Sequence, residues 1–225
     1  MTPPAVAIFD VNETLSDLSP LGDRFEELGA PAELLPAWFA ATLRDGIALT
    51  ASGAYADFRE VGRANLLAQL AGVEGLRRTT AEAAEHVLDG FAALSVHPDV
   101  PEGFRLLRDA RLRIATLTNG SVAIARGLLE RAGLEELAER NLDVSEVRRW
   151  KPAPEPYLYA CRELGVQASD AVLVAAHPWD VHGARSAGLR GAWLDREGLP
   201  YPEVFERPDA SGRDLPSLVR ALIPL

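Results

Sequence analysis

Four short segments of this chain carry side chains that suit nucleophilic catalysis. Asp10 ends an apolar run near the N-terminus, and Lys151 and Asp180 follow far along the sequence. A carboxylate can attack an electrophilic carbon, while an ammonium group can orient that carboxylate and offset developing negative charge. Further hydrogen-bonding or ring side chains stand near these three: Asn12, Thr14, Thr118, Asn119, His177 and Trp179. Such chemistry requires the four segments to meet in one crevice.

Lys151 is singled out by composition. It is the single lysine among 23 basic residues, and all the others are arginine. Arginine serves a solvated surface about as well as lysine does, but it does not replace a compact ammonium group between carboxylates. We therefore predict a chemical role for Lys151, against the alternative that one lysine has survived by chance.

The elements around these residues predict an α/β protein with a doubly wound, mostly parallel sheet. Strands are expected over 5–9, 112–118, 142–147, 171–176 and 191–195, and helices over 121–132, 154–164 and 181–187. Strands that alternate with helices favour a parallel sheet with crossover helices. Ligands of such sheets bind outside the carboxyl ends of the strands. The four chemistry-bearing segments all follow or approach these ends.

One long segment interrupts the alternation after the first strand. Between residues 16 and 97, apolar residues recur at helical spacing over 31–44, 55–70 and 81–94. We expect residues 16–97 to form an all-helical cap domain over the strand ends. Residues 1–15 and 98–225 then form the core domain.

Composition and charge exclude several classes of protein. The chain has 225 residues and a formal charge of −10, so it offers no basic excess to nucleic acid. The longest stretch without charge, residues 114–125, is too short to span a membrane. The N-terminus has no signal-peptide pattern, and one cysteine, Cys161, permits no internal disulfide. We expect a cytoplasmic protein that binds neither nucleic acid nor membrane.

Taken in order, the four segments resemble the motifs of the haloacid dehalogenase (HAD) superfamily of hydrolases. The matching stretches are residues 9–15, 116–120, 150–152 and 175–180. Within that superfamily the chain looks most like the L-2-haloacid dehalogenases, or haloacid dehalogenases of type II. Residues 151–157 fit the pattern Lys-Pro-x-Pro-x-x-Tyr, and Trp179-Asp180 fits a second one. The resemblance covers almost the whole chain and implies a Rossmann-like core with an inserted helical cap.

The second residue after Asp10 favours carbon–halogen chemistry over phosphoryl transfer. HAD phosphatases place an aspartate there as general acid and base, whereas Asn12 has no titratable proton. In the fourth motif, Ala175, Ala176 and His177 stand where a Mg²⁺-binding carboxylate is expected. Halide leaves as an anion without being protonated. We therefore expect no metal and no other cofactor.

The resemblance implies a two-step reaction on a small anionic 2-haloacid. Asp10 displaces halide to form an ester, and water hydrolyses that ester to release a 2-hydroxy acid. Lys151 orients Asp10, Asp180 holds Lys151 and helps to activate water, and Thr14 is assigned to the catalytic group. The expected substrate-binding residues are Val11, Asn12, Thr118, Asn119, Tyr157, His177 and Trp179. The family also suggests a homodimer.

Two positions depart from the family pattern. A cap arginine that receives the halide is expected directly after a tryptophan, but Phe39 follows Trp38. The nearest arginine is Arg44, which is assigned to the halide here, with an exposed helix-end cation as the alternative. His177 stands at an asparagine-like position, where it either donates to the halide, lines a tighter pocket or is merely structural.

Two other functions remain open on the sequence. One is a HAD-fold phosphatase that acts on a small phosphate ester, and the other is a catalytically quiet HAD-fold binding protein. The phosphatase would have to work with Asn12 in place of an acid. The quiet protein would have to retain Asp10, Lys151 and Asp180 without using them.

Overall fold

The sheet is built around the short apolar strand that delivers Asp10. The structure is a computed structural model that describes residues 3–223. Its six parallel strands lie in the order β3-β2-β1-β4-β5-β6. The strands are β1 (Val6–Phe9), β2 (Arg113–Thr118), β3 (Arg140–Asp143), β4 (Ala171–Ala175), β5 (Arg190–Leu194) and β6 (Ala210–Gly212). The predicted doubly wound α/β fold is confirmed.

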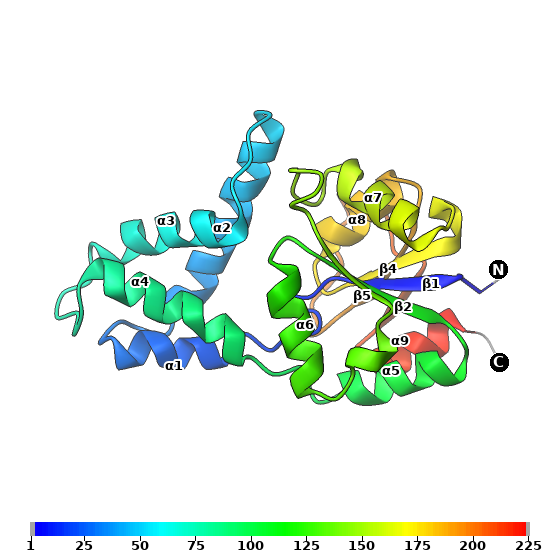
Figure 1. Ribbon diagram of the computed structural model, residues 1–225, viewed down its shortest axis with the longest axis horizontal. Coiled ribbons are helices and arrows are strands. Elements are labelled where there is room, and N and C mark those ends of the chain that lie inside the picture. Colours follow the sequence, from blue (N-terminus) through cyan, green and yellow to red (C-terminus); the bar gives the residue numbers. More distant parts are fainter. Residues whose placement is uncertain (1–2, 224–225) are drawn as a thin grey trace.

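Helices cover both faces of the sheet, as its doubly apolar strands require (Figure 1). Side chains of β1 alternate between two hydrophobic clusters, with Ala7 and Phe9 in one and Val6 and Ile8 in the other. The first cluster includes residues of α5 (Val100–Asp109), α6 (Val122–Arg131) and α9 (Leu215–Leu222). The second includes residues of α7 (Pro154–Leu164) and α8 (Pro178–Ser186).

The segment between β1 and α5 contains helices and no strand longer than a single bridge. These helices are α1 (Pro20–Glu27), α2 (Leu34–Ala51), α3 (Phe58–Leu70) and α4 (Thr80–Asp89), followed by the 3₁₀ turn η1 (Gly90–Ala93). Asp57 and Thr79 begin α3 and α4 with capping boxes, which satisfy free backbone N–H groups. Figure 1 shows this group of helices beyond one end of the sheet.

The chain enters and leaves this helical group at one place. The Asp17 N–H donates to the Ser95 carbonyl (3.0 Å), and the His97 N–H donates to the Leu15 carbonyl (2.9 Å). The two crossings therefore run side by side. An insertion that begins and ends at adjacent points leaves the sheet undisturbed.

Several sequence-based boundaries were wrong. The strand expected at 142–147 lies earlier, at Arg140–Asp143, and α2 continues beyond 44 to Ala51. Helices α5 and α9, strand β6 and the short turns η2 (Glu135–Leu137) and η3 (Ala168–Asp170) were not predicted. The apolar face of α9 packs on the sheet through Leu215, Leu218 and Val219, although its sequence begins in a proline-rich stretch.

Candidate active site

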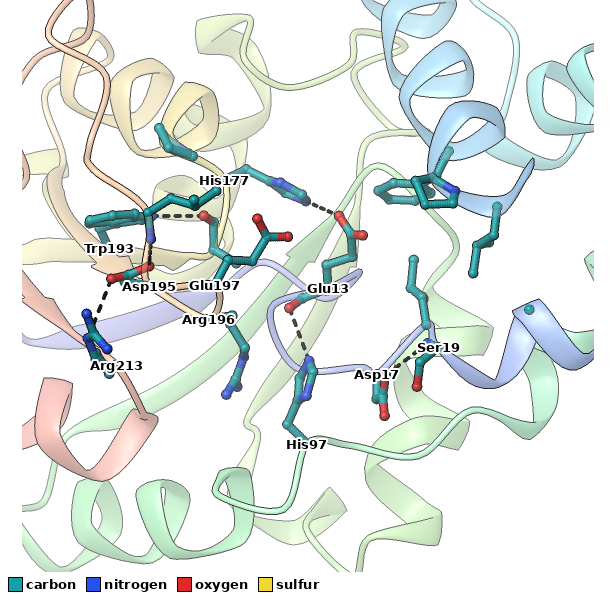
Figure 2. A pocket seen from close by; sticks show the side chains of 18 of the residues that line it. Glu13, Asp17, Ser19, His97, His177, Trp193, Asp195, Arg196, Glu197 and Arg213 are labelled. Carbon is teal, nitrogen blue, oxygen red and sulfur yellow. Dashed lines mark hydrogen bonds and ion pairs between the residues drawn. The ribbon is translucent and has the colours of Figure 1, made fainter. Parts of the chain in front are cut away.

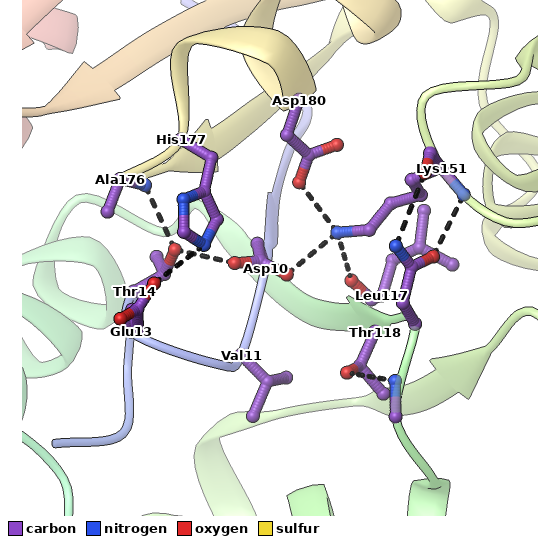
Figure 3. A network of polar contacts seen from close by, with 12 residues as sticks. Asp10, Val11, Glu13, Thr14, Leu117, Thr118, Lys151, Ala176, His177 and Asp180 are labelled. Carbon is purple, nitrogen blue, oxygen red and sulfur yellow. Dashed lines mark hydrogen bonds and ion pairs between the residues drawn. The ribbon is translucent and has the colours of Figure 1, made fainter. Parts of the chain in front are cut away.

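Asp10 lies directly after β1, at the carboxyl edge of the sheet, and both of its carboxylate oxygens are held (Figure 3). The Lys151 ammonium donates to Oδ1 (2.8 Å), and the Thr14 hydroxyl donates to Oδ2 (2.7 Å). The Ala176 N–H, after β4, donates to Thr14 Oγ1 at 2.9 Å and so fixes the direction of that hydroxyl. Asp10 is therefore oriented before a substrate arrives.

Lys151 is completely buried and uses its ammonium group fully. Its Nζ donates to Asp10 Oδ1, to Asp180 Oδ2 (2.6 Å) and to the Leu117 carbonyl (2.9 Å). Burial by itself would lower the pKa of this amine, but the attraction of Asp10 and Asp180 outweighs it and raises the pKa. Lys151 therefore remains a cation, and the chemical role predicted for it has a geometric basis.

Asp180 is held from two sides at the start of α8. Lys151 donates to its Oδ2, and the Tyr157 hydroxyl donates to its Oδ1 at 2.5 Å. Burial and the charge of Asp180 raise the pKa of Tyr157 well above its usual value, so the phenol keeps its proton. Tyr157 is 0% exposed and lies beneath the Lys151–Asp180 pair. The substrate-binding role expected for Tyr157 stays a prediction; in this structure its side chain is buried and its hydroxyl contacts Asp180.

The second motif, residues 116–120, holds the backbone of Lys151 and leaves one hydroxyl group free to donate. Lys151 N–H donates to Asn119 Oδ1 (2.8 Å), and Asn119 Nδ2 donates back to the Lys151 carbonyl (3.3 Å). This exchange fixes the backbone that carries the ammonium. The Gly120 N–H donates to Thr118 Oγ1 (2.9 Å), which leaves the proton of the Thr118 hydroxyl for another acceptor. Asn119 therefore acts through Lys151, while Thr118 can face a ligand.

His177 forms a contact that the sequence did not reveal. Its Nε2 lies 3.3 Å from Glu13 Oε2, and Figure 3 shows this pair beside Thr14 and Asp10. The imidazole is stacked on Trp179 (5.2 Å between ring centroids) and faces Phe39 of α2 (6.3 Å). Burial raises the pKa of Glu13, against the opposing effect of His177 and with the help of the charge on Asp10. The pair joins the loop after β1 to the start of α8.

Glu13 itself has an unusual backbone conformation. Its φ is 61°, in the left-handed region that few non-glycine residues adopt. The His97 Nε2–H donates to its carbonyl at 3.2 Å, and Arg196 donates to the next carbonyl, that of Thr14, at 2.8 and 3.2 Å. Arg196 is itself paired with Asp99. These contacts from distant segments keep the Glu13 side chain turned towards His177.

Residues of this loop line two different cavities. The smaller, of about 80 Å³, is lined by Val11, Asn12, Phe58, Arg59, Thr118 and Gly120 among others. The larger, of about 800 Å³, includes Glu13 and His177 in its lining, and Figure 2 shows the charged side chains that surround it. The expected ligands Val11, Asn12 and Thr118 therefore share one cavity, while His177 belongs to the other.

The α2 and α3 helices are fastened to the segment that carries Lys151. Trp150 stacks on Phe58 (5.9 Å, 20°), and its Nε1–H donates to the Ala56 carbonyl at 3.0 Å. A Cβ on Gly46 of α2 would lie 2.3 Å from Trp150 Cε3, so only glycine permits this approach. The helical group is thereby held next to the strand ends.

Arg44, which the sequence assigns to the halide, makes no contact with Asp10 in this structure. Its side chain is 70% exposed and pairs with Asp45 (2.7 Å). Trp38, Thr42 and Gly46 form the buried side of α2, and Arg44 is placed away from that side by the helical repeat. Arg44 is thus an exposed cation, but it lies within α2 and not at a helix end as the alternative expected, and halide binding stays a prediction.

The sequence did not point to Glu13, Arg59 or Arg196. It also did not reveal the contacts of Trp150 with Ala56 and Phe58. A signal existed for Trp150, which lies next to Lys151 in the third motif. None existed for Arg196, because arginine supplies nearly all basic residues of the chain. Its role depends on contacts with residues about 100 and 180 positions away.

Residues 3–223 contain neither a candidate metal-binding cluster nor a helix that could span a membrane. No three His, Cys, Asp or Glu side chains within that range are grouped so that they could hold a metal ion. No helix within it combines the length and apolar character needed to cross a membrane.

The chain belongs to the haloacid dehalogenase-like hydrolase family, whose model matches residues 4–188. Among curated relatives, it is 30% identical to (S)-2-haloacid dehalogenase 1 of Pseudomonas sp. strain CBS-3 over 207 residues. That match spans 91% of this chain and 90% of the relative. The resemblance inferred from the four motifs is confirmed.

Solved structures agree over the whole fold. The L-2-haloacid dehalogenase from Xanthobacter autotrophicus has a TM-score of 0.83 at 25% identity, covering 96% of this chain and 97% of its own. A dehalogenase solved as an intermediate complex has a TM-score of 0.87 at 25% identity, covering 97% and 96%. The helical group between β1 and α5 is thus included in the similarity.

Proposed function

We propose that this protein hydrolyses small 2-haloacids to 2-hydroxy acids through an ester on Asp10, without a metal ion. The observation that carries the proposal is the Asp10 carboxylate, which Lys151 and Thr14 orient from both oxygens, while the next two residues, Val11 and Asn12, line a small cavity. The names of the relatives, which are haloacid dehalogenases, supply the substrate class.

In the first step, a carboxylate oxygen of Asp10 attacks the carbon that bears the halogen. The carbon–halogen bond breaks as the carbon–oxygen bond forms, and the halide leaves with the bonding electrons. Substitution at this carbon needs the two reacting atoms close together and in line, which favours a nucleophile that is already fixed. Val11, Asn12 and Thr118 line the small cavity that would receive the acid.

In the second step, water attacks the ester carbonyl of Asp10. The water gives one proton to a base, the tetrahedral intermediate expels the 2-hydroxy acid, and the base returns that proton to the departing oxygen. The second proton of the water is released to solvent as Asp10 regains its carboxylate. Lys151 stabilises the negative oxygen that develops on the intermediate.

We assign the base to the Glu13–His177 pair rather than to Asp180. Asp180 is 0% exposed, and its two oxygens already accept from Lys151 and Tyr157. Glu13 and His177 line a large cavity and lie beside Asp10. Burial raises the pKa of Glu13, which makes its carboxylate a stronger base than usual. Phe39 and Trp179 hold the imidazole plane.

The residues fit phosphoryl transfer poorly. Asn12 lines the small cavity where a phosphatase of this family would use a titratable aspartate. Of the carboxylates near Asp10, Asp180 is occupied by Lys151 and Tyr157, and Glu13 faces His177. This donor set suits an ammonium cation more than Mg²⁺.

The same proposal includes the expectations on organisation. Residues 16–97 act as a cap domain on the core formed by 1–15 and 98–225, with the paired crossings at Asp17 and His97 in support. We also propose a cytoplasmic homodimer, which size-exclusion chromatography with light scattering would test for its oligomeric part.

Halide release is the direct test of the function. The wild-type protein is incubated with L-2-chloropropionate, chloroacetate and fluoroacetate in EDTA, and compared with Asp10→Asn. We expect chloride release that persists in EDTA and is lost in the variant, with D-lactate as product of the first acid, because displacement at C2 inverts that centre and ester hydrolysis leaves it unchanged. Absence of release from all three acids would remove the proposal, and p-nitrophenyl phosphate with Mg²⁺ would then test the phosphatase.

A further inference from the structure

The two cavities differ in the charged residues that line them. The large cavity is lined by five carboxylates, those of Glu13, Asp17, Glu33, Asp195 and Glu197, and by two arginines, Arg196 and Arg213. The small cavity has no Asp or Glu among the residues that line it, and its one charged lining residue is Arg59. In a chain of charge −10, an anionic substrate is therefore repelled by the carboxylates of the large cavity and attracted by Arg59 of the small cavity.

Arg59 is held so that part of its guanidinium remains available. It is the second residue of α3, and its Nη2 donates to Glu85 Oε2 (2.5 Å) and Asp89 Oδ1 (2.9 Å) of α4. Both of these bonds use Nη2, which belongs to both bidentate edges of a guanidinium group, so the N–H groups of Nη1 remain as donors. The side chain is 53% exposed, which places it at the mouth of the cavity that it lines.

Three other cationic side chains are already paired within the protein, so they are not free to bind the substrate carboxylate. Lys151 donates to three oxygens within the protein, and Arg196 is committed to Thr14 and Asp99. Arg44 is exposed and paired with Asp45.

We infer that Arg59 binds the carboxylate of the substrate at the mouth of the small cavity. This inference rests on the proposed function and adds the residue that recognises the acid group. The free Nη1 group of Arg59 has an N–H to donate to a carboxylate, and the Thr118 hydroxyl has a proton to donate from the core side. The anchoring carboxylates Glu85 and Asp89 neutralise the site locally, so Arg59 recognises the acid by short hydrogen bonds rather than by long-range attraction.

The chain supplies a matched control for the test. Arg63 lies one turn further along α3 and pairs with the same Glu85 (2.7 Å), but it does not line the cavity. Arg59→Gln and Arg63→Gln remove the same charge from the same cluster. We expect Arg59→Gln to raise KM for L-2-chloropropionate about tenfold or more, the effect of losing a hydrogen bond to a charged group. Arg63→Gln changes KM by less than about twofold, as is usual for an exposed ion pair.

Two further measurements separate recognition from a structural effect. With the neutral analogue 2-chloropropionamide, wild type and Arg59→Gln have the same KM if the arginine reads the carboxylate. Equal losses in Arg59→Gln and Arg63→Gln, or an equal loss with the amide, would overturn the inference. Calorimetric titration with L-lactate reports binding without turnover. If wild type released no halide but Arg59→Gln still weakened L-lactate binding, only the proposed reaction would fail. Unchanged L-lactate binding in Arg59→Gln would remove the role of Arg59 whatever the halide assay shows.

Discussion

The small and the large cavity are lined by different residues of the loop that follows Asp10, and they suit different chemistry. The small one, with Arg59, Asn12 and Thr118, offers donors and no carboxylate to an incoming acid. The large one, with Glu13 and His177, offers groups that accept and return protons. Alkylation of Asp10 needs an oriented anion, whereas hydrolysis of the ester needs water and a base. We therefore expect the two half-reactions to use different cavities next to the loop after β1.

Lys151 stands between the two sides, and its loss is expected to have the largest effect. Lys151→Gln leaves Asp10 and Asp180 buried without their common cation and removes the donor to the ester oxygen. We expect halide release to fall about a thousandfold, as when a donor to a developing oxyanion is removed. Halide release on protein whose fold is checked by circular dichroism measures this. Activity near that of wild type would show that Asp10 does not depend on the ammonium.

The assignment of hydrolysis to the large-cavity side is tested by separating the two steps. In Glu13→Gln and His177→Asn, we expect a burst of one halide per site and then hydrolysis slowed about 100-fold, as for loss of a general base. The ester would accumulate and appear in the intact-protein mass as one added carboxyethyl group. Glu33→Gln, a change in the same cavity without contact to His177, serves as the control. If neither a burst nor an ester were observed, the general base would have to be another residue.

The pH dependence of the second step follows from the direction of the Glu13 shift. Burial raises the pKa of this carboxyl, and protonation removes its ability to accept a proton. Hydrolysis of the ester is therefore lost as the pH falls through that raised pKa, and it is restored as the pH rises above it. In Glu13→Gln this limb of the single-turnover pH profile should disappear.

A bulky substitution in one cavity or the other tests which of the two binds the substrate. Ile124→Trp narrows the small cavity, and Leu199→Trp adds a ring to the large one, where Leu199 is 56% exposed. We expect Ile124→Trp to raise KM for L-2-chloropropionate about tenfold, with less effect on chloroacetate, since a pocket discriminates each methylene at this scale. Equal effects of the two substitutions on KM would contradict the division of roles.

The smallest effect is expected at Arg44. Arg44→Gln removes an exposed ion pair and no contact with Asp10, so kcat and KM should stay within about twofold of wild type. Steady-state halide release measures this directly. A large rise in KM would mean that α2 turns this face inward when substrate binds.

Much of the core could be predicted because its signals are local. The apolar runs of β1, β2, β4 and β5 and the residues that follow them predict both the sheet and the edge where Asp10, Lys151 and Asp180 meet. Strand β3 was misplaced because its sequence, Arg140–Asp143, is mostly polar and carries little periodic signal. Helix α9 was not predicted because the segment before it is rich in proline and its own amphipathic pattern is short. This pattern becomes a helix only by packing on the sheet.

The sequence by itself determined the nucleophile, its lysine and the choice of carbon–halogen over phosphoryl chemistry. These follow from residue type and order, since Asn12 cannot supply a proton wherever it lies. Only the tertiary structure decided that Glu13 faces His177, that Tyr157 lies beneath the site and that Arg59 rather than Arg44 borders a cavity. Those facts depend on the rotation of helices and on contacts between residues far apart in the chain, which residue type does not encode.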